Sequence, residues 1–383
     1  MSQTKRFIIP TTIAVLLLVG AGSLMLWKSG SIKFDQSSLP LTKVIDGEKQ
    51  TQTVDDSLLA QALLTAPDLN SISRFSHSRP TLTELNHHLD PILKDYEFYV
   101  AKSWFDRDYE RMNMQNSIIK YVSAEAAQKS MMERAKGFET ITIKASQEDI
   151  GDARIAYYQP GESGEDPHIV YRFTLGIYGV KIALPTTAKQ IANDADQKTG
   201  LAALASQIAK VQSQRLVDLS KDKLTIATNN AMQRLPEKIS GTQWIGTLPV
   251  SDQEWLGTQH EFKADTLPGF VSAGLSRFAI LERPNEIVEV TVLEFKTSAD
   301  AQRFQSELVP FAQSQEGEVL KLPPSLIAKK ADAVAQKFGM VELQAAPSNY
   351  VVDVSIFAPF ADTNMEMAKK DIIKMSEEAL EKM

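Results

Sequence analysis

The chain has 383 residues, of which 43% are hydrophobic and 23% are charged, as in a globular protein with a sizeable core. Its net charge of −7 gives a nucleic-acid partner no electrostatic support, so we expect none. The sequence contains no cysteine, which excludes disulfide bonds, thiol catalysis, cysteine metal ligands and lipid attachment at a cysteine.

The first feature along the chain is an uncharged, apolar run over residues 7–27. A helix of this length is about 31 Å long, which matches the hydrocarbon core of a bilayer, about 30 Å thick. Lys5 and Arg6 come directly before it, so residues 1–6 are expected in the cytoplasm. The run therefore predicts a single-pass plasma-membrane protein whose C-terminal bulk is extracytoplasmic and whose contact with the membrane is residues 7–27.

The same run also fits a signal peptide that is removed after export. Val19, Gly20 and Ala21 form a small-residue sequence of the kind that precedes a cleavage site. Trp27 and Lys28 instead favour a retained anchor, because an indole at the headgroups followed by an amine in water is typical of a membrane boundary.

Residues 28–60 are rich in Ser, Thr, Gln, Asp and Lys and show no helical or strand period, so we interpret them as a polar stalk. We expect a first domain over residues 61–216, a partly structured connector over 217–250 and a second domain over 251–383.

The two predicted domains contain the same series of motifs, which indicates an internal duplication. Each copy has an apolar strand that leads into an Ala-rich helix, an Asp-Ala pair, a strand that starts with tyrosine and a long final helix. The matching pieces are SAEAAQ from Ser123 and SADAQ from Ser298, each with the serine as N-cap, Asp152-Ala153 and Asp332-Ala333, and the strands from Tyr178 and Tyr350. Length differences between the copies fall in Pro- and Gly-rich loops, as duplicated domains should show.

The predicted fold class is α+β, with two tandem homologous domains after an N-terminal transmembrane helix. Each domain is expected to be an antiparallel sheet with helices packed on one face, because the strands alternate with short turns and have partial period-two patterning.

No catalytic motif is present, since the chain lacks a GxSxG elbow, an HExxH helix, a phosphate-binding loop and a GxGxxG turn. Each of two polar clusters can be interpreted either as a functional site or as an ordinary solvent-exposed segment. The sequence TELNHHLD could begin a helical metal site or be a solvated helix end (Glu84, His87, His88, Asp90), and an acidic loop could hold paired glycosidase carboxylates or keep the loop soluble (Glu162, Glu165, Asp166). We predict no catalytic, cofactor-binding or metal residues.

Two stretches carry the candidate contacts with a partner or ligand. Trp104, Phe105 and Arg107 lie in AKSWFDRDYERM, which could form an exposed aromatic corner for a glycan or protein, or pack in the first core. Phe270 and Arg277 bound the small-residue stretch GFVSAGLSR, which could let a ligand approach the backbone or be a tightly packed strand.

The duplicated unit with SAEAAQ and SADAQ, the two Asp-Ala pairs and the two tyrosine strands resembles actinobacterial envelope proteins. Among these are duplicated lipoproteins of the mycobacterial type and the extracellular sensor domains of mycobacterial receptor kinases. The chain departs from them in having no lipidation cysteine, no disulfide cysteines and no kinase domain. The resemblance implies an extracytoplasmic binding or sensing module without enzymatic activity, and transfers no site residues.

From these observations we predict a membrane-anchored, non-enzymatic binding or sensor-like protein of the cell envelope, without a cofactor. Its partner would be an envelope protein or a cell-wall or lipid ligand, held between the two homologous domains, where such sites are common. The alternatives are a cell-wall-directed hydrolase or transferase, and a structural subunit of an envelope membrane complex.

Overall fold

The computed structural model describes the chain in fourteen stretches. These are residues 56–72, 75, 78–81, 83–86, 95–106, 112–142, 150–161, 166–186, 195–224, 229–258, 267–314, 317–336, 340–357 and 365–382. No helix within these stretches is long and apolar enough to cross a membrane. The predicted anchor at residues 7–27, its possible cleavage site and most of the predicted stalk lie outside the described residues.

The first part of the chain forms an antiparallel sheet, with the strand order β1-β3-β4-β8-β7-β6-β5 and with β2 also paired to β3. Its strands are β1 (Ser78–Pro80), β2 (Glu84–Asn86), β3 (Tyr96–Asp106), β4 (Met112–Tyr121), β5 (Glu139–Thr140), β6 (Ala153–Gln159), β7 (His168–Leu175) and β8 (Tyr178–Pro185). Its helices are α2 (Asp56–Leu59), the 3-10 turn η2 (Ala60–Ala62), α3 (Ala66–Asn70), α4 (Ala124–Ala135) and α6 (Ala195–Ser220).

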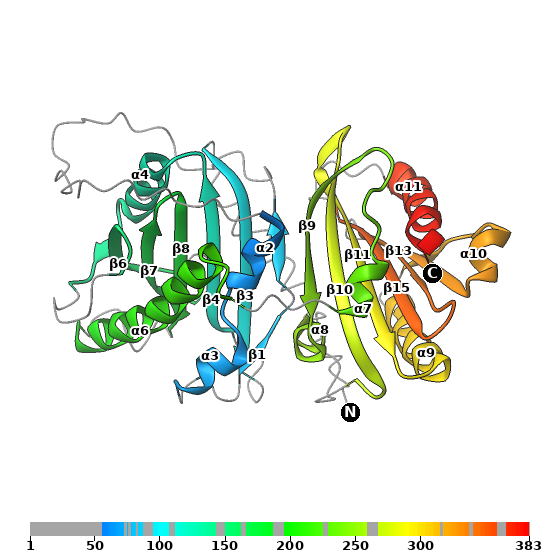
Figure 1. Cartoon of the computed structure of the whole chain (residues 1–383), viewed down its shortest axis with the longest axis horizontal. Coiled ribbons are helices and arrows are strands. Elements are labelled where there is room, and N and C mark those ends of the chain that lie inside the picture. Colours follow the sequence, from blue (N-terminus) through cyan, green and yellow to red (C-terminus); the bar gives the residue numbers. More distant parts are fainter. Residues whose placement is uncertain are drawn as a thin grey trace, which may run out of the picture.

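The second part forms another antiparallel sheet, with the order β12-β13-β14-β15-β11-β10-β9 (Figure 1). Its strands are β9 (Thr242–Val250), β10 (Phe270–Ile280), β11 (Arg283–Phe295), β12 (Glu318–Val319), β13 (Ala331–Gln336), β14 (Met340–Ala345) and β15 (Tyr350–Phe357). Its helices are α7 (Asn230–Arg234), α8 (Asp252–Thr258), α9 (Ser298–Ser314), α10 (Pro324–Ala328), α11 (Met365–Ala379) and the 3-10 turn η4 (Leu380–Lys382). The α+β prediction is confirmed at the level of two antiparallel sheets with helices.

The two sheets have the same connectivity, which supports the duplication inferred from the motifs. Starting from β3 in one and β10 in the other, both run strand, strand, helix, four strands, helix, with the short helix α10 added after β12 in the second unit, and their strand orders coincide position by position. We call the parts the first unit and the second unit.

The tyrosine strands occupy equivalent places in the two sheets. Tyr178 pairs with Lys120, three residues before Ser123, whose hydroxyl accepts the N-cap bond from the backbone N–H of Ala126. Tyr350 pairs with Glu294, three residues before Thr297, whose hydroxyl accepts from the backbone N–H of Asp300. The second cap is therefore Thr297 and not Ser298, so the sequence alignment of the two helices was one residue out of register.

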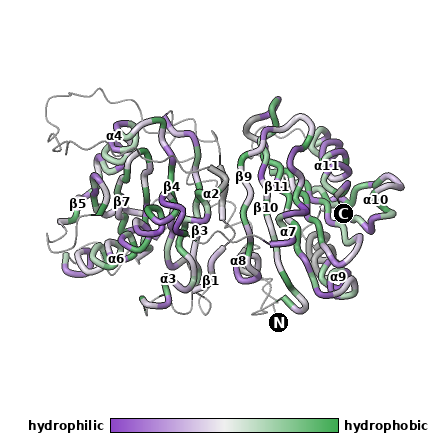
Figure 2. The backbone as a smooth tube through the Cα atoms, in the orientation of Figure 1, coloured by the Kyte–Doolittle hydropathy of each residue, from purple (hydrophilic) through white to green (hydrophobic). Residues whose placement is uncertain are grey.

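Helices cover both faces of each sheet, which corrects the prediction of one covered face. On β7 the six central residues are all buried, and alternate side chains on a strand point to opposite faces. Val170 packs with α4 through Ala135, whereas Tyr171 lies in the same core cluster as Ala205 and Ile208 of α6. A strand that is apolar on both faces requires cover on both, and Figure 2 shows the hydrophobic colour along such inner strands.

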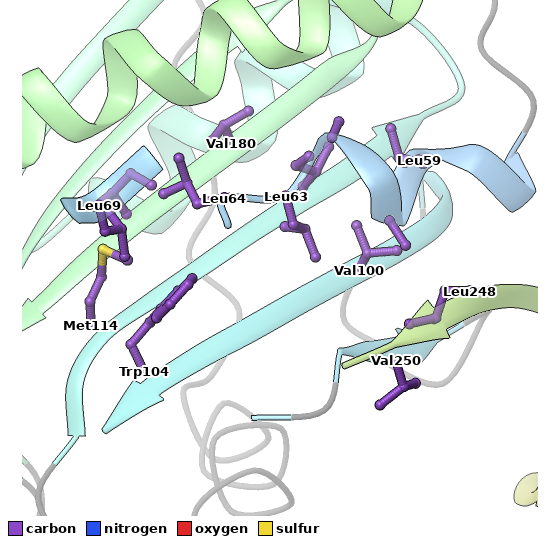
Figure 3. Close-up of a cluster of buried hydrophobic side chains, with 14 of the residues drawn as sticks. Leu59, Leu63, Leu64, Leu69, Val100, Trp104, Met114, Val180, Leu248 and Val250 are labelled. Atoms are coloured by element: carbon purple, nitrogen blue, oxygen red, sulfur yellow. The ribbon is translucent and has the colours of Figure 1, made fainter. Parts of the chain in front are cut away.

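The two units meet where the edge strand β9 packs against α2 and the neighbouring edge of the first sheet. Leu248 and Val250 of β9 join the core cluster that contains Leu59, Leu63 and Val100 of the first unit (Figure 3). This contact, which we call the seam, is filled by buried side chains.

The structure also moves two predicted boundaries. Leu59 and Ala60, placed in the stalk by the sequence, are buried in the core of the first unit because α2 and η2 cover its sheet. Strand β9, placed in the connector, is hydrogen-bonded to β10 over eight residue pairs and belongs to the second sheet.

Candidate binding site beside the seam

The structure separates the five residues predicted to contact a partner. Trp104 and Phe105 are buried in the first unit, so the core interpretation of that stretch holds, and Arg107 lies outside the described residues. Phe270 packs edge-to-face on Phe295, with 6.4 Å between the ring centroids. Only Arg277 belongs to a group of charged side chains.

The middle of the predicted groove between the domains is closed in the described residues. Lys102 of β3 and Glu254 of α8 form an ion pair across the seam, with 2.5 Å between Nζ and Oε1, and their side chains are 8% and 13% exposed. This ion pair and the apolar side chains of the seam fill the centre of the seam. The candidate site lies beside the seam.

The candidate site is a group of charged and polar side chains on one face of the second sheet. Glu289 on β11 lies across from Arg277 on β10 and from Ser355 on β15, and Ser355 in turn lies across from Glu342 on β14. Two residues along each strand, Asp353 on β15 lies across from Gln344 on β14. We call Glu289, Glu342 and Asp353, with Arg277 and Gln344, the carboxylate cluster.

The cluster lies on the sheet face that continues into the seam. Leu275 and Leu248 are paired across β10 and β9, and both belong to the core cluster shared with the first unit. Leu275 is two residues from Arg277 on the same strand, so the two side chains are on the same face. The opposite face is a separate core under α7 and α11.

Hydrogen bonds connect the members of the cluster, but one polar atom is left over. Arg277 donates to Glu289, with 2.6 Å between Nε and Oε2. The Gln344 amide nitrogen is 2.6 Å from Glu342 Oε1 and 3.4 Å from Asp353 Oδ2, and the Ser355 hydroxyl donates to Asp353 over 3.0 Å. Gln344 is 5% exposed, and its side-chain oxygen has no hydrogen-bond partner.

Two of the three carboxyl groups are shifted toward their protonated forms. Burial raises the pKa of Glu342. Burial, followed by the negative charge of Glu342, raises the pKa of Asp353 well above its usual range. Both residues are only half-buried, so they are recessed side chains that solvent still reaches. A carboxyl pair with raised pKa values binds protons readily. It can also accept hydrogen bonds from a donor group that takes the place of the protons.

The first unit has no such cluster at the equivalent positions. Counted from the tyrosine strands and their partners, Gln115, Val170 and Lys181 stand where the second unit has Glu289, Glu342 and Asp353. There Lys181 donates to Gln115, with 2.7 Å between Nζ and Oε1. The same fold is thus built without these carboxylates, which are a property of the second unit alone.

Sequence reasoning missed the cluster because its three carboxylates are spread over 64 positions of the chain, from Glu289 to Asp353. Each carboxylate alternates with buried valine or leucine, which is the ordinary pattern of a strand with one wet face. Alignment of the two tyrosine strands could have shown the exchange of Lys181 for Asp353, which reverses the charge at one sheet position.

The earlier polar candidates do not form a site in the described residues. Glu84 belongs to the strand β2 rather than to a helix, and His87, His88 and Asp90 lie outside the described residues, as do Glu162 and Glu165. Asp166 is exposed. No three His, Asp or Glu side chains within the described stretches are placed to hold a metal ion.

No known family model matches the chain, and no curated protein matches it significantly. Among solved structures, the extracellular domain of PknH from Mycobacterium tuberculosis is similar at a TM-score of 0.30 and 14% identity, over 42% of this chain and 98% of that domain. A chain of the Tle4-Tli4 complex is similar at a TM-score of 0.18 and 9% identity, over 71% of this chain and 92% of that one. One of these is a mycobacterial extracellular domain, in line with the weak resemblance noted from the motifs, but likenesses at these scores carry no argument about function.

Proposed function

We propose that the protein is a single-pass, membrane-anchored protein of the cell envelope, whose exported part binds a partner or ligand and catalyses no reaction. The carboxylate cluster beside the seam carries this proposal. Three carboxylates face one guanidinium there, burial raises the pKa values of two of them, and a buried amide oxygen has no partner. A binding site with one missing member has these properties.

The location rests on the sequence. The apolar run over residues 7–27, with Lys5 and Arg6 before it, is what a membrane anchor with a cytoplasmic N-terminus requires. The ligand site was predicted between the two homologous domains. We now propose it beside the seam, at the carboxylate cluster of the second unit, because the centre of the seam is closed.

Single cysteines test the location and the site together, because the natural chain has none. In intact cells of the native host, a membrane-impermeant maleimide should label Lys374→Cys, which is exposed on α11, and should leave Ser2→Cys unlabelled. Asp332→Cys, which replaces an exposed residue beside Gln344, should be labelled slowly because the bound partner covers it. Glu342→Val in the same chain should restore fast labelling.

Labelling of Ser2→Cys, or none at Lys374→Cys, would contradict the extracytoplasmic location. Equal labelling of Asp332→Cys with and without Glu342→Val would contradict the binding site.

One observation favours a second function, a hydrolase acting on cell-wall material. Glu342 and Asp353 are a close carboxyl pair with raised pKa values, and a carboxyl group that stays protonated near neutral pH can act as a general acid. Purified protein assayed on cell-wall glycan fragments would then show turnover that is lost in Asp353→Asn. The binding proposal predicts no turnover in either protein.

A further inference from the structure

We propose that the carboxylate cluster is the receptor of an organic cation, an ammonium or guanidinium group, which binds at the carboxylates of Glu342 and Asp353. This inference rests on the proposed function and names the chemistry of its ligand.

The cluster is rich in hydrogen-bond acceptors. The carboxylates of Glu289, Glu342 and Asp353 offer six oxygens, and the one cation of the cluster is Arg277, whose guanidinium pairs with Glu289 Oε2 over 2.5 Å. Ionised carboxylates on Glu342 and Asp353 therefore have no positive partner of their own within the cluster.

A second observation, independent of the carboxylates, points to a donor that is brought by a ligand. Gln344 is more than nine-tenths buried, its amide group is held between Glu342 and Asp353 by the nitrogen, and its oxygen has no hydrogen-bond partner. An unsatisfied buried amide oxygen is unfavourable by about 1–3 kcal/mol. An N–H donor brought to this oxygen by a ligand would satisfy it.

The two units carry opposite charges at one equivalent sheet position. The first unit places Lys181 where the second places Asp353, and the Lys181 ammonium is there bonded to Gln115. An ammonium group is thus part of the equivalent sheet position in the first unit, supplied by the chain itself. In the second unit the position carries an acceptor and the cation of the cluster, Arg277, is paired with Glu289, so a further cation would come from outside the unit.

Directional donors suit the cluster better than a metal ion does. The described residues contain no three carboxylate or imidazole side chains placed to ligate a metal. Ammonium and guanidinium groups carry several N–H donors and bind carboxylates at the longer distances of charge-assisted hydrogen bonds, about 2.7–2.9 Å.

The charged groups that face the cluster are known for the described residues of each neighbouring element. They are Arg277 of β10, Glu289 of β11, Asp332 of β13, Glu342 of β14 and Asp353 of β15, while α9 contributes the uncharged Gln305, which donates to Asp332 over 3.3 Å. Only one of the five is basic. Raising the pH removes protons from Glu342 and Asp353, whose pKa values are raised, and should strengthen the binding of a cation.

The experiment is a calorimetric titration of the detergent-solubilised full chain with two probes, agmatine and the peptide Gly-Arg-Gly amide. Both should bind, more tightly at pH 7.5 than at pH 5.5, and with an enthalpy that depends on the ionisation enthalpy of the buffer, since each cation displaces protons. Glu342→Val, which introduces the residue of the first unit, and Asp353→Asn should each weaken binding by about tenfold or more. Glu318→Gln, at an exposed carboxylate on β12, is the matched control and should leave the affinity unchanged.

Tighter binding of the peptide than of agmatine would identify a partner's side chain as the source of the cation, and equal binding would identify a small organic cation. Absence of binding by both probes, or equal affinities in Glu342→Val and the parent chain, would overturn the inference. The cysteine-labelling experiment can succeed in that case, so the proposed function would survive with a ligand of different chemistry.

Discussion

At the scale of single residues, two sites with shifted pKa values respond to pH in opposite directions. The carboxyl groups of Glu342 and Asp353 hold protons in the native state more strongly than in the unfolded chain, whereas His168 of β7 holds its proton less strongly. Burial is the largest cause at all three residues, and a neighbouring like charge adds to it at Asp353 and His168, but these effects act on acids in one unit and on a base in the other.

Asp353→Asn should make the stability of the second unit less dependent on pH. Because the native pKa values of Asp353 and Glu342 are raised, the stability is fully present below the ordinary carboxyl pKa and is lost as the pH rises through the native values. Urea unfolding of the parent chain should therefore show a stability that falls as the pH rises above the ordinary carboxyl range. The variant should show a smaller fall, and an unchanged slope would show that this pair does not carry the pH dependence.

His168→Gln should remove an opposite dependence in the first unit. Burial and the nearby positive charge of Lys181 lower the pKa of His168 to about 4 from 6.5, so its contribution is present above pH 6.5 and is lost as the pH falls toward 4. The loss amounts to about 2–3 kcal/mol from the size of this shift. Thermal unfolding followed by circular dichroism between pH 4 and pH 7 should show a melting temperature that depends less on pH in the variant than in the parent chain. The same pH dependence in both would mean that the pKa of His168 is not lowered by folding.

At the scale of elements, the first unit depends on a short segment that the sequence assigned in part to a stalk. The segment from α2 to α3 buries Leu59, Leu63, Leu64 and Leu69 in the first core. Its backbone carbonyls are held by side chains, since Arg215 of α6 donates to those of Gln61, Ala62 and Leu63 over 2.7–3.3 Å and pairs with Asp68. Gln212 adds a bond to the carbonyl of Ala62 over 2.6 Å.

Arg215→Ala should destabilise the protein by about 2–4 kcal/mol, because it removes the side-chain donor of the Gln61 and Leu63 carbonyls and leaves Asp68 without its cation. Gln214→Ala is the matched control, since Gln214 is on the same helix and its amide donates to Asp218 at an exposed position. Chemical denaturation should separate the two variants clearly. Equal midpoints would mean that the segment is held by its leucines alone.

How far the sequence predicted the elements depends on the range of the interactions involved. Local signals worked, since the Ser123 cap, the tyrosine strands and the final helices are where the capping and alternation patterns place them. Three features failed for lack of a long-range view: β2 is a strand because it pairs with β3, β9 belongs to a sheet because β10 is beside it, and helices cover both faces because the inner strands are buried on both. Of the predicted contact residues, only Arg277 lies in the candidate site, whose acids come together through strand pairing.

At the scale of the whole molecule, the two units form one body through the seam. Figure 1 shows the edges of the two sheets meeting at the centre of the molecule, with α2 and α8 beside them. The apolar contact is continuous with the core of the first unit, and the ion pair of Lys102 and Glu254 is its charged contact. The site beside the seam therefore depends on how firmly the units are joined.

Glu254→Gln should loosen this junction by about 3–5 kcal/mol, because the Lys102 ammonium would remain buried without its carboxylate. Hydrogen exchange should then speed up in β9 and in α2, on the two sides of the seam. The double variant Lys102→Met/Glu254→Gln removes both charges and should recover most of the protection. Equal exchange in the single variant and the parent chain would show that the apolar packing alone joins the units.

The central claim is that the second unit binds a cationic group outside the membrane at the carboxylate cluster. The most direct measurement is photo-crosslinking in the native host, with p-benzoylphenylalanine in place of Asp332 and, as the control on the opposite face, in place of Lys374, followed by mass spectrometry of the adducts. We expect one adduct from position 332, formed with a molecule that carries an amine or guanidinium group next to the attachment point, and its loss when Glu342→Val is added. No adduct at position 332, or the same adduct with and without Glu342→Val, would contradict cation binding at the cluster.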